Sequence, residues 1–156
     1  MMKKLFVGLM VGAVSAASLA ADWRTVPSAH TDPKIAIDWQ SVKSETHQLS
    51  YDEEMQYLEM KVRKVFSKPQ TLKSGKYFTD ETYMLSVDCE NKQYAITDYE
   101  WFINKNKIAE NKQIAWSAAL EDFKPVPRVY AKSPAELKNY KQIDITSSFI
   151  CNQMVG

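Results

Sequence analysis

Cys89 and Cys151 are the two residues of this 156-residue chain whose chemistry is easiest to define. Neither belongs to a Cys-x-x-Cys pair or a cluster of cysteine with histidine, so the pattern gives little support to a metal site or a catalytic thiol. In an oxidising compartment two thiols tend to pair. We therefore expect an intramolecular disulfide between them, with a reactive or metal-binding thiol as the alternative.

The histidines and one acidic run are the next residues that are able to support metal binding or acid–base catalysis. His30 and His47 lie in polar, loop-like surroundings without a second ligand at metal spacing, which favours exposed side chains. Asp52, Glu53 and Glu54 are adjacent in a polar segment, which is typical of a solvated surface. The sequence has no serine-hydrolase or zinc-protease motif. We expect no catalytic residue and no metal, with a hydrolase as a remote alternative.

Basic residues gather in one stretch of the sequence. Such a patch can contact an acidic partner, although lysines at sheet edges also prevent aggregation and then need no partner. Ordinary solvent-facing polarity therefore remains the alternative interpretation. The candidate binding patch consists of Lys61, Arg63, Lys64, Lys68, Lys73 and Lys76.

Residues 1–20 have the parts of a secretory signal peptide. Two lysines precede an apolar core at residues 5–14, and small residues end the segment. The core is shorter than the roughly 18 residues that span a bilayer. We expect cleavage before Ala21 and export into or beyond a Gram-negative type of envelope, to the periplasm, the cell surface or the medium. Residues 21–156 are then a single domain without a membrane span.

Charge and glycine content exclude two further classes of function. The chain carries 20 basic and 19 acidic residues, and loss of Lys3 and Lys4 with the signal peptide changes its formal net charge from +1 to −1. That balance predicts no nucleic-acid partner. Gly75 is the only internal glycine beyond residue 20, whereas nucleotide-binding loops need several. We expect no cofactor and a protein as the partner.

Alternating apolar residues predict an antiparallel sheet in the first two thirds of the chain. Residues 68–76 are interpreted as a loop. In the aromatic strand the alternation places Tyr94, Ile96 and Phe102 on one face. Tyr99, Trp101 and Ile103 then lie on the other face, which a helix or a partner must cover. The expected strands are 23–26, 34–42, 57–66, 82–89, 93–103 and 107–118.

A helix is predicted to follow. Ser133 and Glu136 form a capping box around Pro134, which is typical of a helix start. Residues 145–151 have no clear period and are interpreted as a short element that docks the C-terminus. The expected fold is α+β, with an antiparallel sheet of about five to six strands and a C-terminal helical segment packed on it and tied by the disulfide.

Several short motifs resemble the surface-adhesin protein E family of small exported bacterial proteins. They are Asp22-Trp23, Ile37-Asp38 with Ser41, Val87-Asp88-Cys89 and the late Cys151. The resemblance implies an α+β domain in which the Cys89–Cys151 bond holds a C-terminal helical segment to the sheet, and binding of host extracellular-matrix proteins. It implies no catalytic residue.

One departure from that family leaves a second function open. The best-known member looks lipid-anchored, whereas this chain has no cysteine after its expected cleavage site. The alternative is a periplasmic accessory factor or a protein inhibitor, for example of lysozyme, which would use a protruding carboxylate or serine loop. The oligomeric state is not predicted.

Overall fold

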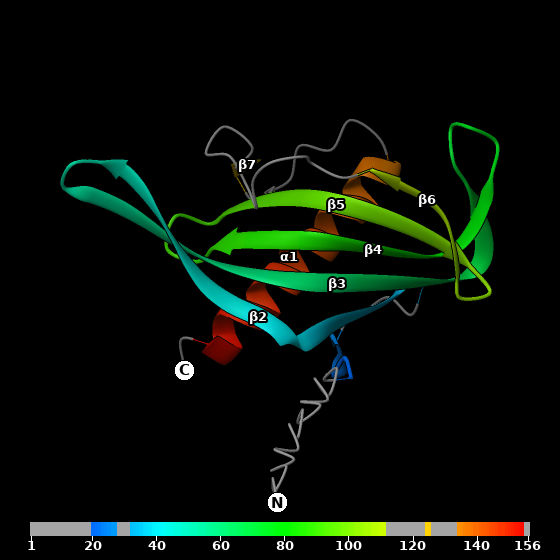
Figure 1. Ribbon diagram of the computed structural model, residues 1–156, viewed down its shortest axis with the longest axis horizontal. Helices are drawn as coiled ribbons and strands as arrows, with labels where there is room; N and C mark the ends of the chain where they lie inside the picture. The colour runs from blue at the N-terminus through cyan, green and yellow to red at the C-terminus, as the bar shows by residue number, and fades with distance from the viewer. Residues whose placement is uncertain (1–19, 28–31, 112–123, 126–133, 155–156) are drawn as a thin grey trace, which may run out of the picture.

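The computed structural model describes residues 20–27, 32–111, 124–125 and 134–154 (Figure 1). Residues 1–19 of the expected signal peptide and His30 lie outside the described residues. Within them the elements are β1 (Trp23–Thr25), β2 (Lys34–Ser50), β3 (Glu53–Thr71), β4 (Tyr77–Asp88), β5 (Gln93–Ile103), β6 (Asn106–Asn111), β7 (Lys124–Pro125) and α1 (Pro134–Met154).

The strands form one antiparallel sheet in the order β1-β2-β3-β4-β5-β6, and the two-residue β7 pairs with β5. Consecutive strands are therefore neighbours, as tight turns between antiparallel strands require. Helix α1 crosses one face of this sheet diagonally (Figure 1). The predicted antiparallel sheet with a C-terminal helix is confirmed. No helix in the described ranges has the length and apolar character needed to cross a membrane.

The core lies between the sheet and α1. Ile143 and Ile150 are fully buried, and each such side chain removed from water contributes about 1.5–3 kcal/mol. The alternation predicted for the first long strands accounts for the sheet side of this core. The buried cluster includes Val26, Ile35, Ile37, Met60, Val62, Tyr83, Leu85, Val87 and Tyr94.

The predicted faces of β5 are wrong at one point. Ile96 pairs with Leu85 and Trp101 pairs with Glu81, so both lie on the face that α1 covers. A bulge at Asp98, whose φ is 54°, adds one residue to β5 and reverses the alternation beyond it. The aromatic residues Tyr94, Tyr99 and Trp101 therefore share the core side, and only Phe102 turns to the open face.

The C-terminal segment is also simpler than predicted. Residues 145–151 are not a separate element but the last turns of α1, which is continuous to Met154. The helical period is hidden because polar residues occupy buried positions next to Ile143 and Ile150. Thr146 is one of them, and its hydroxyl donates to the Gln142 carbonyl at 2.6 Å, which satisfies it locally.

The predicted disulfide is confirmed. Cys89, in the turn after β4, is bonded to Cys151 near the end of α1, and the two residues are separated by 62 positions in the sequence. The bond holds the helix against the end of the sheet. With it the described residues contain no free cysteine.

Strand β3 is longer than predicted at both ends, and β2 is longer at its C-terminal end. The expected strand 57–66 extends to Glu53–Thr71, so residues 68–71 belong to a strand and not to a loop. The expected strand 34–42 continues to Ser50, which places His47 in a strand as well. The expected strand 107–118 is described only as β6, and residues 112–118 lie outside the described residues.

Candidate functional site: a basic arm beside a neutralised sheet face

The six residues of the candidate patch do not form one surface. Alternate residues of β3 point to opposite faces, so Lys61 and Arg63 lie on the open face of the sheet and Lys64 lies on the side of α1. The other three lysines lie beyond the point where β3 leaves the body of the sheet. The two halves of the patch therefore have different environments.

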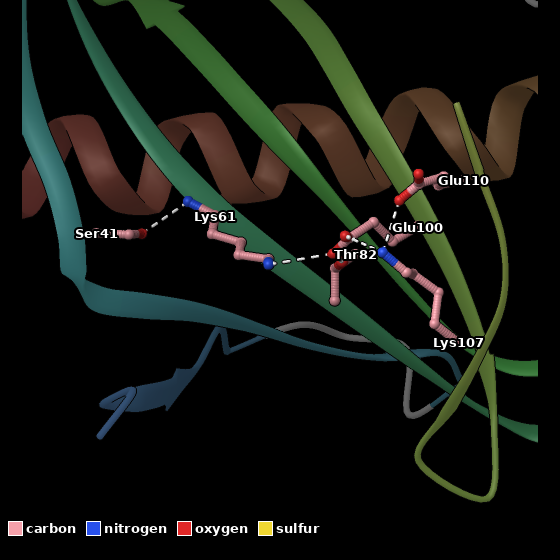
Figure 2. A network of polar contacts seen from close by, with 6 residues as sticks. All are labelled: Ser41, Lys61, Thr82, Glu100, Lys107 and Glu110. Carbon is pink, nitrogen blue, oxygen red and sulfur yellow. Dashed lines mark hydrogen bonds and ion pairs between the residues drawn. The ribbon is translucent and has the colours of Figure 1, made fainter. Parts of the chain in front are cut away.

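Lys61 is part of a polar network on the open face (Figure 2). Its ammonium group lies 3.3 Å from Glu100 Oε2, which also accepts from Thr82 Oγ1 at 3.2 Å. The other oxygen of Glu100 lies 3.4 Å from Lys107 Nζ, which in turn pairs with Glu110 at 2.6 Å. Two cations and two carboxylates thus neutralise one another across β3, β5 and β6.

The pKa of Glu100 reflects this network. Partial burial favours the neutral acid and raises the pKa, but the attraction and hydrogen bonds of Lys61 and Lys107 outweigh it. The net result is a pKa of Glu100 below its usual value, so the carboxylate stays ionised and keeps both lysines engaged.

Arg63 and Lys64 are also matched by acids. Arg63 donates to Asp80 Oδ1 through Nε at 3.1 Å and through a terminal guanidinium nitrogen. Lys64 is only 6 % exposed, and its Nζ lies 3.7 Å from a carboxylate oxygen of Glu81 and 5.2 Å from the centre of the Tyr83 ring. Burial lowers the pKa of Lys64 against the opposing effect of Glu81. These two cations are therefore engaged within the protein.

The remaining lysines lie on a two-stranded arm. Pairing of β3 with β2 ends at Val65, and pairing of β4 with β5 begins at Asp80, so residues 66–79 pair only with each other. We name this segment the basic arm. Lys68, Lys73 and Lys76 are exposed on it, and its sequence contains no acidic residue.

The tip of the basic arm is a tight turn. Gly75 has a φ of 85°, which residues with a side chain rarely adopt, and its N–H donates to the Leu72 carbonyl at 2.9 Å. The Leu72 N–H in turn donates to the Lys76 carbonyl at 2.8 Å. These two bonds close the turn between the strands that carry the lysines.

The base of the basic arm is anchored to the body of the protein. Phe78 is buried and packs edge-on against Phe66, with ring centres 5.7 Å apart, and against Trp101 at 6.4 Å. Asp32 accepts hydrogen bonds from the backbone N–H and the hydroxyl of Ser67, both at 2.8 Å. The lysines are therefore presented on a positioned hairpin and not on a free loop.

A shallow apolar hollow lies beside the basic arm. It has a volume of about 410 Å³ and is lined by Lys76, Tyr77, Ile103 and Ile108. Tyr77 is 62 % exposed, and Lys76 Nζ reaches across to the Ile108 carbonyl at 3.2 Å. An apolar floor with the ammonium group of Lys76 at its rim is suited to an aromatic group that is flanked by a carboxylate.

The other residues considered from the sequence lie apart from this arm. Asp52, Glu53 and Glu54 are exposed at the far tip of the β2–β3 hairpin, as a solvated acidic segment should be. His47 is half-buried in β2 and pairs with Met55 in register. The described part of the chain contains no group of three or more histidine, cysteine or acidic side chains placed to hold a metal ion.

Comparisons with known proteins add no further assignment. No family model, curated protein or solved structure matches this chain. The candidate site rests on the geometry of the basic arm.

Sequence reasoning found the lysines of the arm but missed the hollow. Tyr77 and Ile108 come from strands separated by about 30 residues, and nothing in either segment indicates that they share a surface. The one available signal was the absence of acidic residues from 66 to 79, which distinguishes Lys68, Lys73 and Lys76 from the basic residues that precede them.

Proposed function

We propose that this chain is an exported, non-enzymatic protein-binding domain that docks on acidic protein surfaces through the basic arm. One observation carries the proposal: the lysines of the arm have no acidic residue within their segment, whereas Lys61, Arg63 and Lys64 are each paired with a carboxylate. Unpaired charges on an anchored hairpin steer and orient an oppositely charged partner.

The partner class follows from export and charge. An exported domain meets envelope proteins or the extracellular-matrix proteins of a host, and an acidic face on either complements three lysines. Host-matrix binding is also what the resemblance to the surface-adhesin E family implies. We place matrix proteins first and envelope proteins second.

The experiment compares the wild type with a variant in which the three arm lysines become glutamine, Lys68→Gln, Lys73→Gln and Lys76→Gln. Each protein is immobilised and exposed separately to a host-matrix extract and to an envelope extract. The proposal expects proteins retained by the wild type to be lost from the variant. Retention of the same proteins by both would contradict it. Protease shaving of intact cells then separates the two partner classes, because only a surface protein reaches host matrix.

A second candidate, a protein inhibitor, is favoured by a different observation. The tip of the β2–β3 hairpin carries Asp52, Glu53 and Glu54, all exposed, and forms a protruding carboxylate loop. A loop of this kind fits the active-site cleft of a cationic enzyme such as a lysozyme. In a lysozyme activity assay this candidate expects inhibition by the wild type that is lost in Asp52→Asn/Glu53→Gln/Glu54→Gln and retained in the arm-lysine variant.

A further inference from the structure

The β2–β3 hairpin projects from the sheet at the end opposite to the basic arm (Figure 1). Strand β4 pairs with β3 only from Leu58 onward, so residues 45–57 pair only with each other and form a second two-stranded arm. We name it the acidic arm. In Figure 1 it extends to the left, in cyan and teal, and the basic arm lies at the right end of the sheet, in green, and points upward.

The two arms carry opposite charges without internal compensation at their tips. The acidic arm contains four carboxylates and no lysine or arginine. One of them, Glu45, is bridged by Lys43 at the base of the arm at 2.8 Å, whereas Asp52, Glu53 and Glu54 are exposed at the tip. The basic arm contains three lysines and no carboxylate. Opposite ends of one molecule are therefore complementary in charge.

Each arm also carries exposed apolar groups that can contact the other. Tyr51, at the tip of the acidic arm, is fully exposed and directly precedes the three carboxylates. The hollow beside the basic arm is shallow and open to solvent, and Tyr77, Ile103 and Ile108 form an apolar floor that one tyrosine ring can contact. Tyrosines are frequent anchors of protein interfaces.

We propose that this protein self-associates head to tail, with Tyr51 of one copy seated in the hollow of the next and its flanking carboxylates facing the basic arm. The two contacting surfaces are different, so each dimer keeps one free acidic arm on one copy and one free basic arm on the other, and short chains can grow. The inference rests on the proposed function in treating the basic arm as a docking surface. A basic arm that holds the acidic arm of another copy cannot bind a partner protein at the same time, so self-association and partner binding compete for it.

Sedimentation equilibrium of the oxidised wild-type protein tests the charge dependence. At an ionic strength of about 0.01 M, where charges act over roughly 30 Å, the weight-average mass should exceed that of the monomer and rise with concentration. At about 1 M salt, where this range is roughly 3 Å, the mass should fall toward that of the monomer. A wild type that stays monomeric at low salt up to millimolar concentration overturns the inference.

Variants locate the contact. Tyr51→Ser and Asp52→Asn/Glu53→Gln/Glu54→Gln should each weaken self-association at least tenfold. The matched control Glu90→Gln, an exposed carboxylate outside both arms, should leave it unchanged. Circular dichroism and the absence of free thiols show whether each variant keeps the fold. Unchanged self-association in both arm variants overturns the inference.

A charge exchange gives a test that does not depend on loss of binding. The first variant has two acidic arms and carries Lys68→Glu/Lys73→Glu/Lys76→Glu. The second has two basic arms and carries Asp52→Lys/Glu53→Lys/Glu54→Lys. Each should be monomeric alone, and an equimolar mixture should associate at low salt. A mixture that remains monomeric contradicts the proposed contact.

The outcomes also separate this inference from the proposed function. Neutralising the acidic arm removes self-association but leaves the basic arm intact, so that variant should still bind matrix or envelope proteins, with equal or higher apparent affinity. If it binds these proteins and the wild type never self-associates, the proposed function stands and this inference fails.

Discussion

The ammonium group of Lys61 lies 3.3 Å from a carboxylate oxygen of Glu100, and this ion pair crosses β4 to join β3 with β5. This ion pair determines which basic residues are available to a partner protein. Because Lys61 is held by a carboxylate of its own chain, it is less available to a partner than the lysines of the basic arm. The same relationship makes stability depend on the ionisation of Glu100.

Glu100→Gln should lower the free energy of unfolding by about 1 kcal/mol at pH 7, since the two lysines lose their shared carboxylate. The folded-state pKa of Glu100 lies below its usual value of 4.5, so the ionised group stabilises the fold above pH 4.5 and this contribution is lost as the pH falls through the folded-state pKa. Urea unfolding at pH 7 and pH 3 should therefore show a smaller difference between wild type and variant at pH 3. A difference in unfolding free energy that does not depend on pH would contradict this prediction. The control is Glu53→Gln, at the exposed tip of the β2–β3 hairpin.

Removing the disulfide should destabilise the protein strongly. For a loop closed by residues 62 positions apart, the chain-entropy model gives roughly 4 kcal/mol. Cys89→Ser/Cys151→Ser should lose about that much, as should the wild type after reduction, in chemical denaturation. Alkylation of the denatured, unreduced protein should label no cysteine. Labelled thiols would show that the bond is absent from the native protein.

Breaking the buried pair between Lys64 and Glu81 should cost more than replacing both partners. Lys64→Ala leaves a carboxylate that is mostly buried without its cation, and we expect a loss of about 3 kcal/mol. Lys64→Met/Glu81→Gln keeps the volume and keeps an acceptor for the indole N–H of Trp101, which donates to Glu81 at 2.9 Å. The double variant should recover most of the loss in thermal or chemical unfolding. A double variant as unstable as Lys64→Ala would show that the cost does not come from an unpaired charge.

The turn at the tip of the basic arm should be sensitive to its glycine. A Cβ added at Gly75 meets no atom within 4 Å, so Gly75→Ala tests backbone conformation without a steric clash. At a φ of 85° we expect a loss of about 1 kcal/mol, and a smaller loss for Gly75→Asn, because asparagine tolerates left-handed conformations better. Ser74→Ala, at the exposed neighbouring position, should be neutral in the same denaturation assay. Equal stability of Gly75→Ala and wild type would contradict the assignment of strain.

The sequence allowed the sheet, the helix start and the disulfide to be predicted because each leaves a local signature. Ile35 and Ile37 alternate with small or polar residues, and Pro134 follows a capping serine. The faces of β5 were mispredicted because a bulge is a single-residue event, and the one at Asp98 leaves no signature in composition.

The candidate site was predictable only in part. The sequence shows where lysines gather, but which of them are neutralised depends on acids that arrive from other strands, such as Asp80 for Arg63 and Glu100 for Lys61. The arms were missed for a related reason. A pair of strands projects as an arm when the neighbouring strands of the sheet end before it does. Where those neighbours end depends on the tertiary structure.

Equilibrium binding of three proteins to immobilised matrix extract and envelope extract at physiological salt decides whether the basic arm is the docking surface. They are the wild type, the variant Lys68→Gln/Lys73→Gln/Lys76→Gln, and a control with the same charge loss outside the arm, Lys92→Gln/Lys105→Gln/Lys141→Gln. Three lysine contacts of about 0.5 kcal/mol each correspond to roughly tenfold in affinity. We predict that the arm variant binds at least about tenfold more weakly than the wild type and that the control binds like the wild type. Equal binding by the arm variant, or an equal loss in the control, would contradict recognition through the basic arm.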